Sequence, residues 1–229
     1  MKFYYDLHIH SCLSPCGDED MTPNNIVNMS LLKGLDFIAV TDHNSILNLE
    51  AVINCSKNTD VKVIPGMEIE TSEEIHMLSL FPNLIDAENC YDTVSKNMLG
   101  IKNRPDIFGR QLIMNDNDEI TGIEDMLLVT ATKLNLDKVK LLVENNHGIC
   151  IPAHIDRNSY SIISNLGTIP DIGFSCVELS KNADFSQYNN YFYKKIRNSD
   201  AHYLEDIFEA DNYVDIEEKS IECLFSHLK

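Results

Sequence analysis

Six short apolar runs, rich in Val and Ile and closed by turn residues, constrain the fold of this chain more than any other feature. Runs of this length and composition are typical of buried strands. Segments with helical period lie between several of them, at residues 22–33, 46–56 and 135–146. Because strands and helices alternate, the sequence predicts an α/β fold built on a parallel sheet or barrel. The predicted strands cover residues 3–9, 35–41, 61–69, 75–81, 148–154 and 174–179.

The length of 229 residues fits a single α/β barrel, since barrels of roughly 200–250 residues commonly form one domain. We therefore expect one domain over residues 1–229. Residues 87–132 break the alternation because they are rich in Asn, Asp, Gly and Pro, and residues 113–122 (IMNDNDEITG) predict a hairpin. We interpret 87–132 as an insertion that either forms a wall selecting the substrate or only packs at the periphery. Residues 205–229 predict a closing strand and helix.

The charge balance and the cysteine count limit the partners and the compartment. The chain carries 36 acidic and 18 basic residues, a formal charge of -18, which repels a long polyphosphate backbone. The N-terminus contains His and Asp where a leader would be apolar, and no run reaches the roughly 18–20 apolar residues of a membrane span. Seven cysteines, an odd number, favour reduced thiols. We expect a cytoplasmic protein that binds neither long nucleic acid nor a membrane.

Histidines mark the ends of the predicted strands. Side chains two residues apart on a strand point to the same face, so His8 and His10 form a chelating pair. Asp200 and His202 have the same spacing. The carboxyl ends of the strands of a parallel barrel converge on one mouth, where such pairs can meet. Six of the eight histidines lie at or just beyond a predicted strand end: His8, His10, His43, His76, His154 and His202.

Each of these positions also has an ordinary structural interpretation. Asp42 and His43 could be turn residues, and Glu68 could be a solvated carboxylate at a strand end. His76 and His154 could be hydrogen-bonded core histidines. The joint pattern decides between these interpretations, because six clustered histidines would repel one another if they were protonated and bound no metal. The sequence therefore predicts a metal site.

Six motifs carry a resemblance to a known family, the PHP (polymerase and histidinol phosphatase) domain. The resemblance extends over residues 6–202 and preserves the order of the family's motifs. It implies a distorted (β/α)7 barrel with a trinuclear metal centre at the C-terminal mouth, which usually supports phosphoester hydrolysis. The motifs are DLHIHS at 6–11, TDHN at 41–44, GMEIE at 66–70, EIHMLSL at 74–80, PAHID at 152–156 and NSDAH at 198–202.

The resemblance also implies a ligand set of two or three divalent ions, Zn, Mn or Fe. Glu68 would bridge two metals, and the loop after the first strand would supply one ligand to the third metal. In that loop we select Asp18, and Cys16 is the competing candidate, whose thiolate would favour Zn. The implied ligands are His8, His10, Glu68 and Asp200 for the first metal, Glu68, His76 and His154 for the second, and His43, His202 and Asp18 for the third. The implied catalytic residues are His8, His10, Glu68, Asp200 and His202.

Further residues are candidates for supporting roles. Asp6 and Asp42 lie next to ligand histidines, and we expect each to accept a ring N–H and orient an imidazole. Arg157, Lys181 and Arg110 are candidate contacts for a substrate phosphate, but the surface cation is the more common role for each, because nothing in the sequence directs it inward.

The expected function is metal-dependent hydrolysis of a small phosphomonoester or a short nucleotide-type phosphoester. In the expected reaction, a hydroxide that bridges two metals attacks phosphorus. One alternative is a PHP-like module that binds metal for structure or regulation without turnover. A less favoured alternative is an amidohydrolase, which usually requires a carboxylated Lys and a lone late Asp. The sequence does not specify an oligomeric state.

Overall fold

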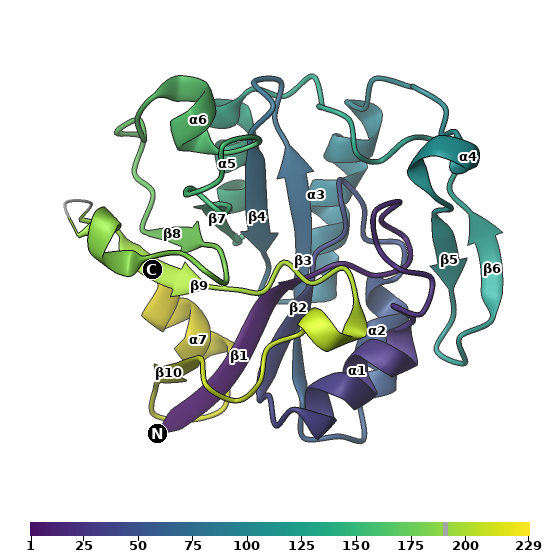
Figure 1. The fold of residues 1–229 in the computed structure, drawn as a ribbon, viewed down its shortest axis with the longest axis horizontal. Coiled ribbons are helices and arrows are strands. Elements are labelled where there is room, and N and C mark those ends of the chain that lie inside the picture. Colours follow the sequence, from purple (N-terminus) through teal and green to yellow (C-terminus); the bar gives the residue numbers. More distant parts are fainter. Residues whose placement is uncertain (190–191) are drawn as a thin grey trace.

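A strongly curled six-stranded sheet forms the centre of the computed structural model, which describes residues 1–189 and 192–229 (Figure 1). The strand order is β10-β1-β2-β3-β4-β7, and β8 pairs in parallel with β9 in a separate two-stranded sheet. The predicted α/β class is confirmed, with the sheet closing only part of a barrel. These strands are β1 Lys2–Ile9, β2 Phe37–Val40, β3 Lys62–Glu70, β4 His76–Leu80, β7 Ile149–Pro152, β8 Cys176–Leu179, β9 Lys194–Arg197 and β10 Tyr213–Asp215.

Two strands depart from the expected parallel arrangement, β10, which pairs antiparallel with β1, and β4. β1, β2 and β3 are parallel neighbours, but β4 is antiparallel to both β3 and β7. The connection from β3 to β4 spans only residues 71–75, whereas a parallel crossover needs about a dozen residues. β4 therefore begins at the edge where the parallel strands end. His76, expected at a strand end, is instead the first residue of β4 and lies at the same edge.

Helices cover one face of the sheet. The three predicted helices are confirmed as α1 (Pro23–Leu32), α2 (Leu49–Ser56) and α5 (Leu136–Asn145), although α2 begins later than the expected residue 46. The side chain of Thr22 accepts a hydrogen bond from the amide of Asn25 and caps α1. The core between sheet and helices includes Ile38 and Val40 of β2, whereas their neighbours Phe37 and Ala39 face a second core. This alternation is the period of two that a strand imposes.

The second core fills the inside of the curled sheet, and α7 (Ile221–Leu228) closes it. α7 follows β10, which pairs with β1, so the predicted closing strand and helix are confirmed. Leu224, Phe225 and Leu228 of α7 are buried against the strands. Burial of each such side chain contributes about 1.5–3 kcal/mol, which is enough to hold the C-terminal helix in place.

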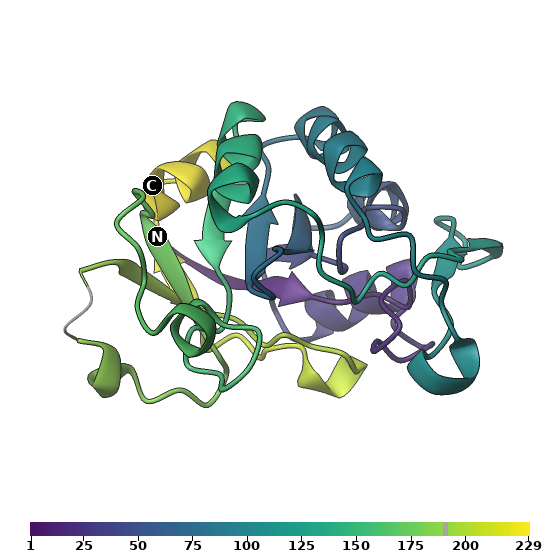
Figure 2. The same ribbon diagram turned by 90° about the horizontal axis from the view of Figure 1, so that it is seen from above.

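Residues 87–132 fall into two structural parts. The first part belongs to α3 (Leu84–Lys96), which buries Ala87, Cys90 and Val94 in the main core. The second part contains α4 (Pro105–Phe108) and the antiparallel pair of β5 (Leu112–Met114) and β6 (Ile120–Ile123), which confirms the predicted hairpin. Figure 2 shows that this second part projects from the rest of the structure at the end opposite the two termini.

The remaining helical segments are short and lie in the C-terminal half of the chain. They are α6 (Ile162–Leu166) and the 3-10 turns η1 (Phe185–Tyr188) and η2 (Leu204–Asp206). Within residues 1–189 and 192–229, no helix has the length and apolar character needed to cross a bilayer.

Candidate metal centre

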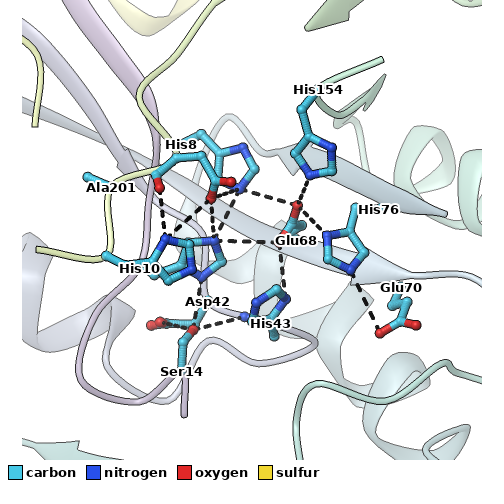
Figure 3. Close-up of polar contacts among 12 residues, drawn as sticks. His8, His10, Ser14, Asp42, His43, Glu68, Glu70, His76, His154 and Ala201 are labelled. Atoms are coloured by element: carbon cyan, nitrogen blue, oxygen red, sulfur yellow. Dashed lines mark hydrogen bonds and ion pairs between the residues drawn. The ribbon is translucent and has the colours of Figure 1, made fainter. Parts of the chain in front are cut away.

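Six strands and the loops that adjoin them bring the predicted ligands to one edge of the sheet (Figure 3). His8 lies near the end of β1, and His10 follows that strand. Glu68 belongs to β3, and its backbone bridges to that of His43, which follows β2. His154 lies two residues beyond β7. Eight of the nine predicted ligands meet here: His8, His10, His43, Glu68, His76, His154, Asp200 and His202.

Glu68 lies at the centre of the cluster, as Figure 3 shows. Its Oε1 atom is 3.0 Å from Nδ1 of His76 and 3.2 Å from Nε2 of His154. Its Oε2 atom is 3.0 Å from Nδ1 of His43. The side chain is 1% exposed, so these imidazoles and those of the first strand replace water around the carboxylate. This position between two groups of imidazoles suits a carboxylate that bridges two metals.

Asp200 and the first-strand histidines form a second group. Asp200 Oδ1 lies 3.0 Å from His10 Nε2 and 3.4 Å from His8 Nε2. The expectation that Asp200 and His202 share a strand face is wrong, because both lie in the loop after β9 and Asp200 has φ 53. His202 instead stacks its ring on His10, with centroids 4.4 Å apart. The two residues therefore contribute to different groups of potential ligands.

The hydrogen bonds around the first-strand pair fix their tautomers. His8 Nδ1 faces the carboxylate of Glu178 at 3.0 Å, so Nδ1 must carry the proton. His10 Nδ1 lies 3.0 Å from Ser14 Oγ, whose own proton goes to Asp42 at 2.6 Å, so this Nδ1 is also the donor. If both rings are neutral, their bare Nε2 lone pairs face each other across 3.2 Å. That arrangement is favourable only when a cation lies between the two nitrogens, either a metal ion or the proton that the raised pKa of His8 retains.

Unpartnered buried atoms also fit a metal. Among the described residues, Glu68 Oε2 and Asp200 Oδ1 are buried and have no hydrogen-bond partner. Buried polar atoms are normally hydrogen-bonded, and an orphaned carboxylate oxygen indicates a missing partner. Imidazole nitrogens together with carboxylate oxygens are ligands suited to Zn, Mn or Fe. Ligand atoms within 4.8 Å of one another form three groups: His8, His10 and Asp200; His43, Glu68 and His76; and His10, His43 and His202.

The sequence analysis missed Glu178 of β8. This residue is 1% exposed and receives hydrogen bonds from the backbone amide of His154 at 2.9 Å and from Asn198 Nδ2 at 2.7 Å, besides its contact with His8. It therefore links β8, β7 and the loop after β9 to the first strand. The available signal was a single acid within the otherwise apolar run CVEL, which is unusual for a fully buried strand.

Asp42 and Asp6 support the cluster less directly than expected. The expectation that each accepts a ring N–H from a ligand histidine is wrong. Asp42 reaches His10 through the hydroxyl of Ser14. Asp6 accepts hydrogen bonds from two backbone amides, including that of Ser199 at 3.0 Å, and so anchors the loop that carries the late ligands.

The loop after β1 carries both the selected Asp18 and the competing Cys16. Asp18 Oδ1 accepts a hydrogen bond from the amide of Asp20 at 2.9 Å, and in the described part of the chain Asp18 belongs to none of the three ligand groups. Cys16 likewise belongs to none of these groups among the described residues, although its thiol is electrostatically coupled to the imidazoles of His43 and His202. Burial alone would raise the pKa of this thiol, but the two imidazoles outweigh burial and lower it to about 6.

Electrostatic contacts shift the protonation of the cluster in opposite directions. Burial lowers the pKa of His8, but three surrounding carboxylates outweigh burial and raise that pKa well above its usual value. Burial and two neighbouring imidazoles hold the pKa of His10 well below its usual value. Burial opposes ionisation of Glu68, yet the imidazoles around it keep its pKa well below the usual range. Such strongly perturbed groups in one small space are typical of functional sites.

Of the three candidate phosphate contacts, Arg157 is the one that reaches the ligand cluster within the described residues. Its Nη1 atom lies 2.6 Å from Asp200 Oδ2, and its side chain is 43% exposed at the mouth. Arg110 pairs instead with Glu19, at 2.7 Å from Nε to Oε1. Lys181 binds the carbonyl oxygen of Asp206 at 3.3 Å and lines a separate cavity.

A model of the PHP domain matches residues 6–217. The chain belongs to the PHP domain family. The predicted membership in this family of metal-dependent phosphoesterases is thus confirmed. A 5'-3' exoribonuclease from Haemophilus influenzae is 32% identical to this chain over 79 residues. This stretch covers 33% of this chain and 28% of the exoribonuclease.

Solved structures share the PHP fold. PfuEndoQ, a lesion-specific endonuclease from Pyrococcus furiosus, matches with a TM-score of 0.77 and 21% identity, covering 100% of this chain and 56% of that chain. A structure described as a metal-dependent phosphoesterase from Bifidobacterium adolescentis matches with a TM-score of 0.62 and 16% identity, covering 96% and 95% of the two chains. These matches confirm the distorted barrel fold. The PHP chain spans about half the length of the endonuclease and less than a third of the exoribonuclease.

Proposed function

We propose that this PHP protein hydrolyses a short nucleotide-type phosphoester with two or three bound divalent ions. The observation that carries the proposal is the convergence of Nε2 of His8 and Nε2 of His10, 3.2 Å apart, with two buried carboxylate oxygens that have no hydrogen-bond partner among the described residues. A protein that used this cluster only for packing would bury carboxylate oxygens without hydrogen-bond partners and would need a proton on His8 to keep the two Nε2 atoms from repelling each other. Divalent ions remove that cost and give the cluster a chemical role.

The proposed ligands are the eight clustered residues, with Glu68 shared between two ions. When bound, the ions would supply Lewis acidity to the phosphoryl group. The protein's own part is to hold the donors in place before substrate arrives. Glu178 and Ser14 fix the ring orientation of His8 and His10, and Asp6 holds the loop that carries Asp200.

Two residues at the mouth support a nucleotide as substrate. Arg157 is half-exposed beside Asp200 and can offer its remaining N–H groups to a phosphate oxygen. The ring of Tyr160 stacks on His76 with centroids 4.9 Å apart, and the residue is 47% exposed. An aromatic face beside a phosphate contact suits a base and its phosphate. The similarity to an exoribonuclease and to the endonuclease PfuEndoQ also favours this class.

The strongly acidic chain favours a short substrate. A formal charge of -18 repels a long polyphosphate backbone, whereas one or two phosphates can bind at a locally positive centre. Mononucleotides and dinucleotides are therefore the expected substrates.

The test is hydrolysis of a substrate panel by protein purified without chelator and supplied with Mn or Zn. The panel contains simple phosphomonoesters, mononucleotides, dinucleotides and long single strands. We expect turnover to be highest for the nucleotides and dinucleotides and to be abolished in His8→Ala. The matched control is His147→Ala, because the side chain of His147 is 76% exposed and lies outside the ligand groups among the described residues. Turnover confined to simple monoesters would reject the substrate class, and metal-loaded protein without turnover would favour a regulatory module.

A further inference from the structure

A cavity of about 330 Å³, lined mainly by charged side chains, adjoins the loop that carries Asp200 and His202. That loop begins after Arg197, the last residue of β9, and ends at η2. Residues at both ends of the loop line the cavity, and within the described residues none of the eight proposed metal ligands does. The cavity is therefore separate from the metal centre but shares a loop with it.

The half-buried guanidinium of Arg197, which lines the cavity, has more donors than partners. Its Nη2 atom donates to the carbonyl oxygen of Ala183 at 3.3 Å, and its Nε atom has no hydrogen-bond partner among the described residues. Its Cζ atom lies 4.5 Å from the ring centroid of Phe185, a contact that orients the planar group without neutralising its charge. In the described part of the chain, Arg197 forms no ion pair with a carboxylate, although acidic residues outnumber basic ones by 36 to 18. Because charges removed from water are normally paired, this guanidinium favours binding of an anion.

Lys181 brings a second free cation to the same cavity. Arg197 is paired with Leu179 in the β8–β9 ladder, two residues before Lys181, so the two side chains extend from neighbouring strand ends. Lys181 Nζ donates to the carbonyl oxygen of Asp206 at 3.3 Å and, among the described residues, has no carboxylate partner. The third cation of the lining, Lys33, is already engaged, because it binds two backbone carbonyl oxygens at 2.6 and 2.8 Å and pairs with a carboxylate at 3.4 Å. Lys181 and Arg197 are thus the two cations available to a ligand.

Three carboxylates also line the cavity and limit the charge of its ligand. Glu209 is paired with Lys33, whereas Glu205 and Asp211 are exposed and form no ion pair in the part of the chain that the structure describes. The three cations and three carboxylates leave the lining without net charge. A chain of phosphates would therefore meet repulsion from the unpaired acids once the two free cations are neutralised. A ligand with a single anionic group avoids this cost.

We propose that this cavity is a second binding site, which takes a small molecule through one carboxylate or phosphate group bound by Arg197 and Lys181. A guanidinium offers parallel N–H groups to the oxygens of either anion, and an ammonium adds a point charge beside them. The volume lies at the lower end of the range of small-molecule pockets and leaves room for the body of a small organic ligand. Binding at this site does not depend on the proposed hydrolysis.

A ligand in the cavity would act on the metal centre through the shared loop. Asp6 already joins the two ends of this loop, because it accepts hydrogen bonds from the amides of Ser199 and Phe208, both at 3.0 Å. A ligand held by Arg197 and Lys181 adds a second connection, since Arg197 precedes the loop and Lys181 contacts the backbone of η2. Occupancy should therefore steady the segment that presents Asp200, which makes the cavity an effector site.

The first test locates the anion directly in crystals of the full chain. Selenate represents a phosphate and 4-bromobenzoate represents a carboxylate, and anomalous scattering from selenium or bromine gives the position of each. We expect a peak between Arg197 and Lys181 for at least one of the two probes, and the probe that binds identifies the anionic group. The peak should be lost in Arg197→Gln and retained in the control Lys57→Gln, because Lys57 is exposed and lies outside the lining. Selenate bound at the metal centre would appear separately, beside Glu68.

Amide hydrogen exchange gives a second readout in solution. At a probe concentration of about ten times the dissociation constant, exchange over residues 198–212 should slow roughly 10-fold in wild type and in Lys57→Gln. It should be nearly unchanged in Arg197→Gln and in Lys181→Gln. Lys181 is exposed, so its substitution keeps the test valid if Arg197→Gln folds poorly.

Three outcomes would count against the inference. Neither probe in the cavity, or protection that persists in Lys181→Gln, would overturn the binding site. Protection limited to residues 205–212 would overturn the effector role, because the ligand would then not reach the loop that carries Asp200. None of these readouts involves turnover, so a failure of the proposed hydrolysis would leave them unchanged.

Discussion

Glu178 holds His8 by its Nδ1 atom at 3.0 Å and thereby leaves Nε2 of His8 directed at His10. A carboxylate at this position fixes the tautomer and makes the imidazole a better donor to a metal. The same carboxylate receives the amide of His154 at 2.9 Å, so one buried acid orients two of the proposed ligands from behind. The cluster is therefore organised before any metal or substrate is bound.

Replacement of Glu178 by Gln tests this support. The amide keeps the size of the side chain but removes its charge, so we expect metal affinity to fall roughly 10–100-fold while the fold persists. Competition against a chelator of known affinity measures the change. Glu217→Gln is the matched control, because Glu217 is exposed. Equal affinity in Glu178→Gln and wild type would show that the contact has no role in metal binding.

Ser14 and Asp42 are predicted to act on His10 as one unit. Asp42 contacts the ring only through the Ser14 hydroxyl, so Ser14→Ala and Asp42→Asn should each weaken metal binding at this site. The double variant should lose little more than the more severe single variant, because the two residues form one chain of hydrogen bonds. A double-mutant cycle on the metal dissociation constants provides the measurement. Strictly additive losses would contradict the relay.

Gly109→Ala is predicted to destabilise the protein and loosen the Cys16 loop. Gly109 has φ +99, and an added Cβ would collide with the carbonyl oxygen of Pro15. Gly167→Ala is the matched control, since Gly167 has φ +77 with nothing within 4 Å of an added Cβ. The control should cost about 1–2 kcal/mol for the backbone conformation alone. Denaturant unfolding should give a larger cost for Gly109→Ala, and equal costs would reject the close approach.

Arg157→Ala is predicted to raise KM for a nucleotide substrate, with a smaller effect on kcat. Loss of one charge-assisted hydrogen bond costs about 1.5–3 kcal/mol, which corresponds to roughly 10–100-fold in binding. Arg157→Lys should recover part of this loss because it keeps the charge but not the planar fork. Arg110→Ala, which breaks the pair with Glu19, should leave KM close to wild type. Steady-state kinetics with an unchanged KM in Arg157→Ala would exclude the proposed phosphate contact.

The parts of the site that the sequence predicted are those carried by local spacing. His8 and His10 lie two residues apart at the end of a strand, and their role as neighbours follows from strand geometry alone. Glu68 and His154 were identified through short motifs at the ends of strands, where a barrel gathers its side chains. Their exact contacts still required the structure, because no local rule brings residues more than eighty positions apart to 3.2 Å.

The errors have physical reasons as well. The short turn after β3 forces β4 to run antiparallel, and this placed His76 at the beginning of its strand. Glu178 has no local signature, because its partners come from other strands. The choice between Asp18 and Cys16 has no local rule either, because it depends on the conformation of an irregular loop that hydrogen bonds to Asp20 and His202 shape.

The most direct test of the central claim is to measure bound metal and hydrolysis on one sample while metal is returned to stripped protein. Because Glu68 links the two groups of proposed ligands, we expect turnover of a nucleotide phosphoester to rise with metal content and to saturate at two to three ions per chain. His8→Ala should bind fewer ions and remain inactive at saturation. Turnover in fully stripped protein, or a stripped protein that takes up no metal and stays inactive, would contradict the account.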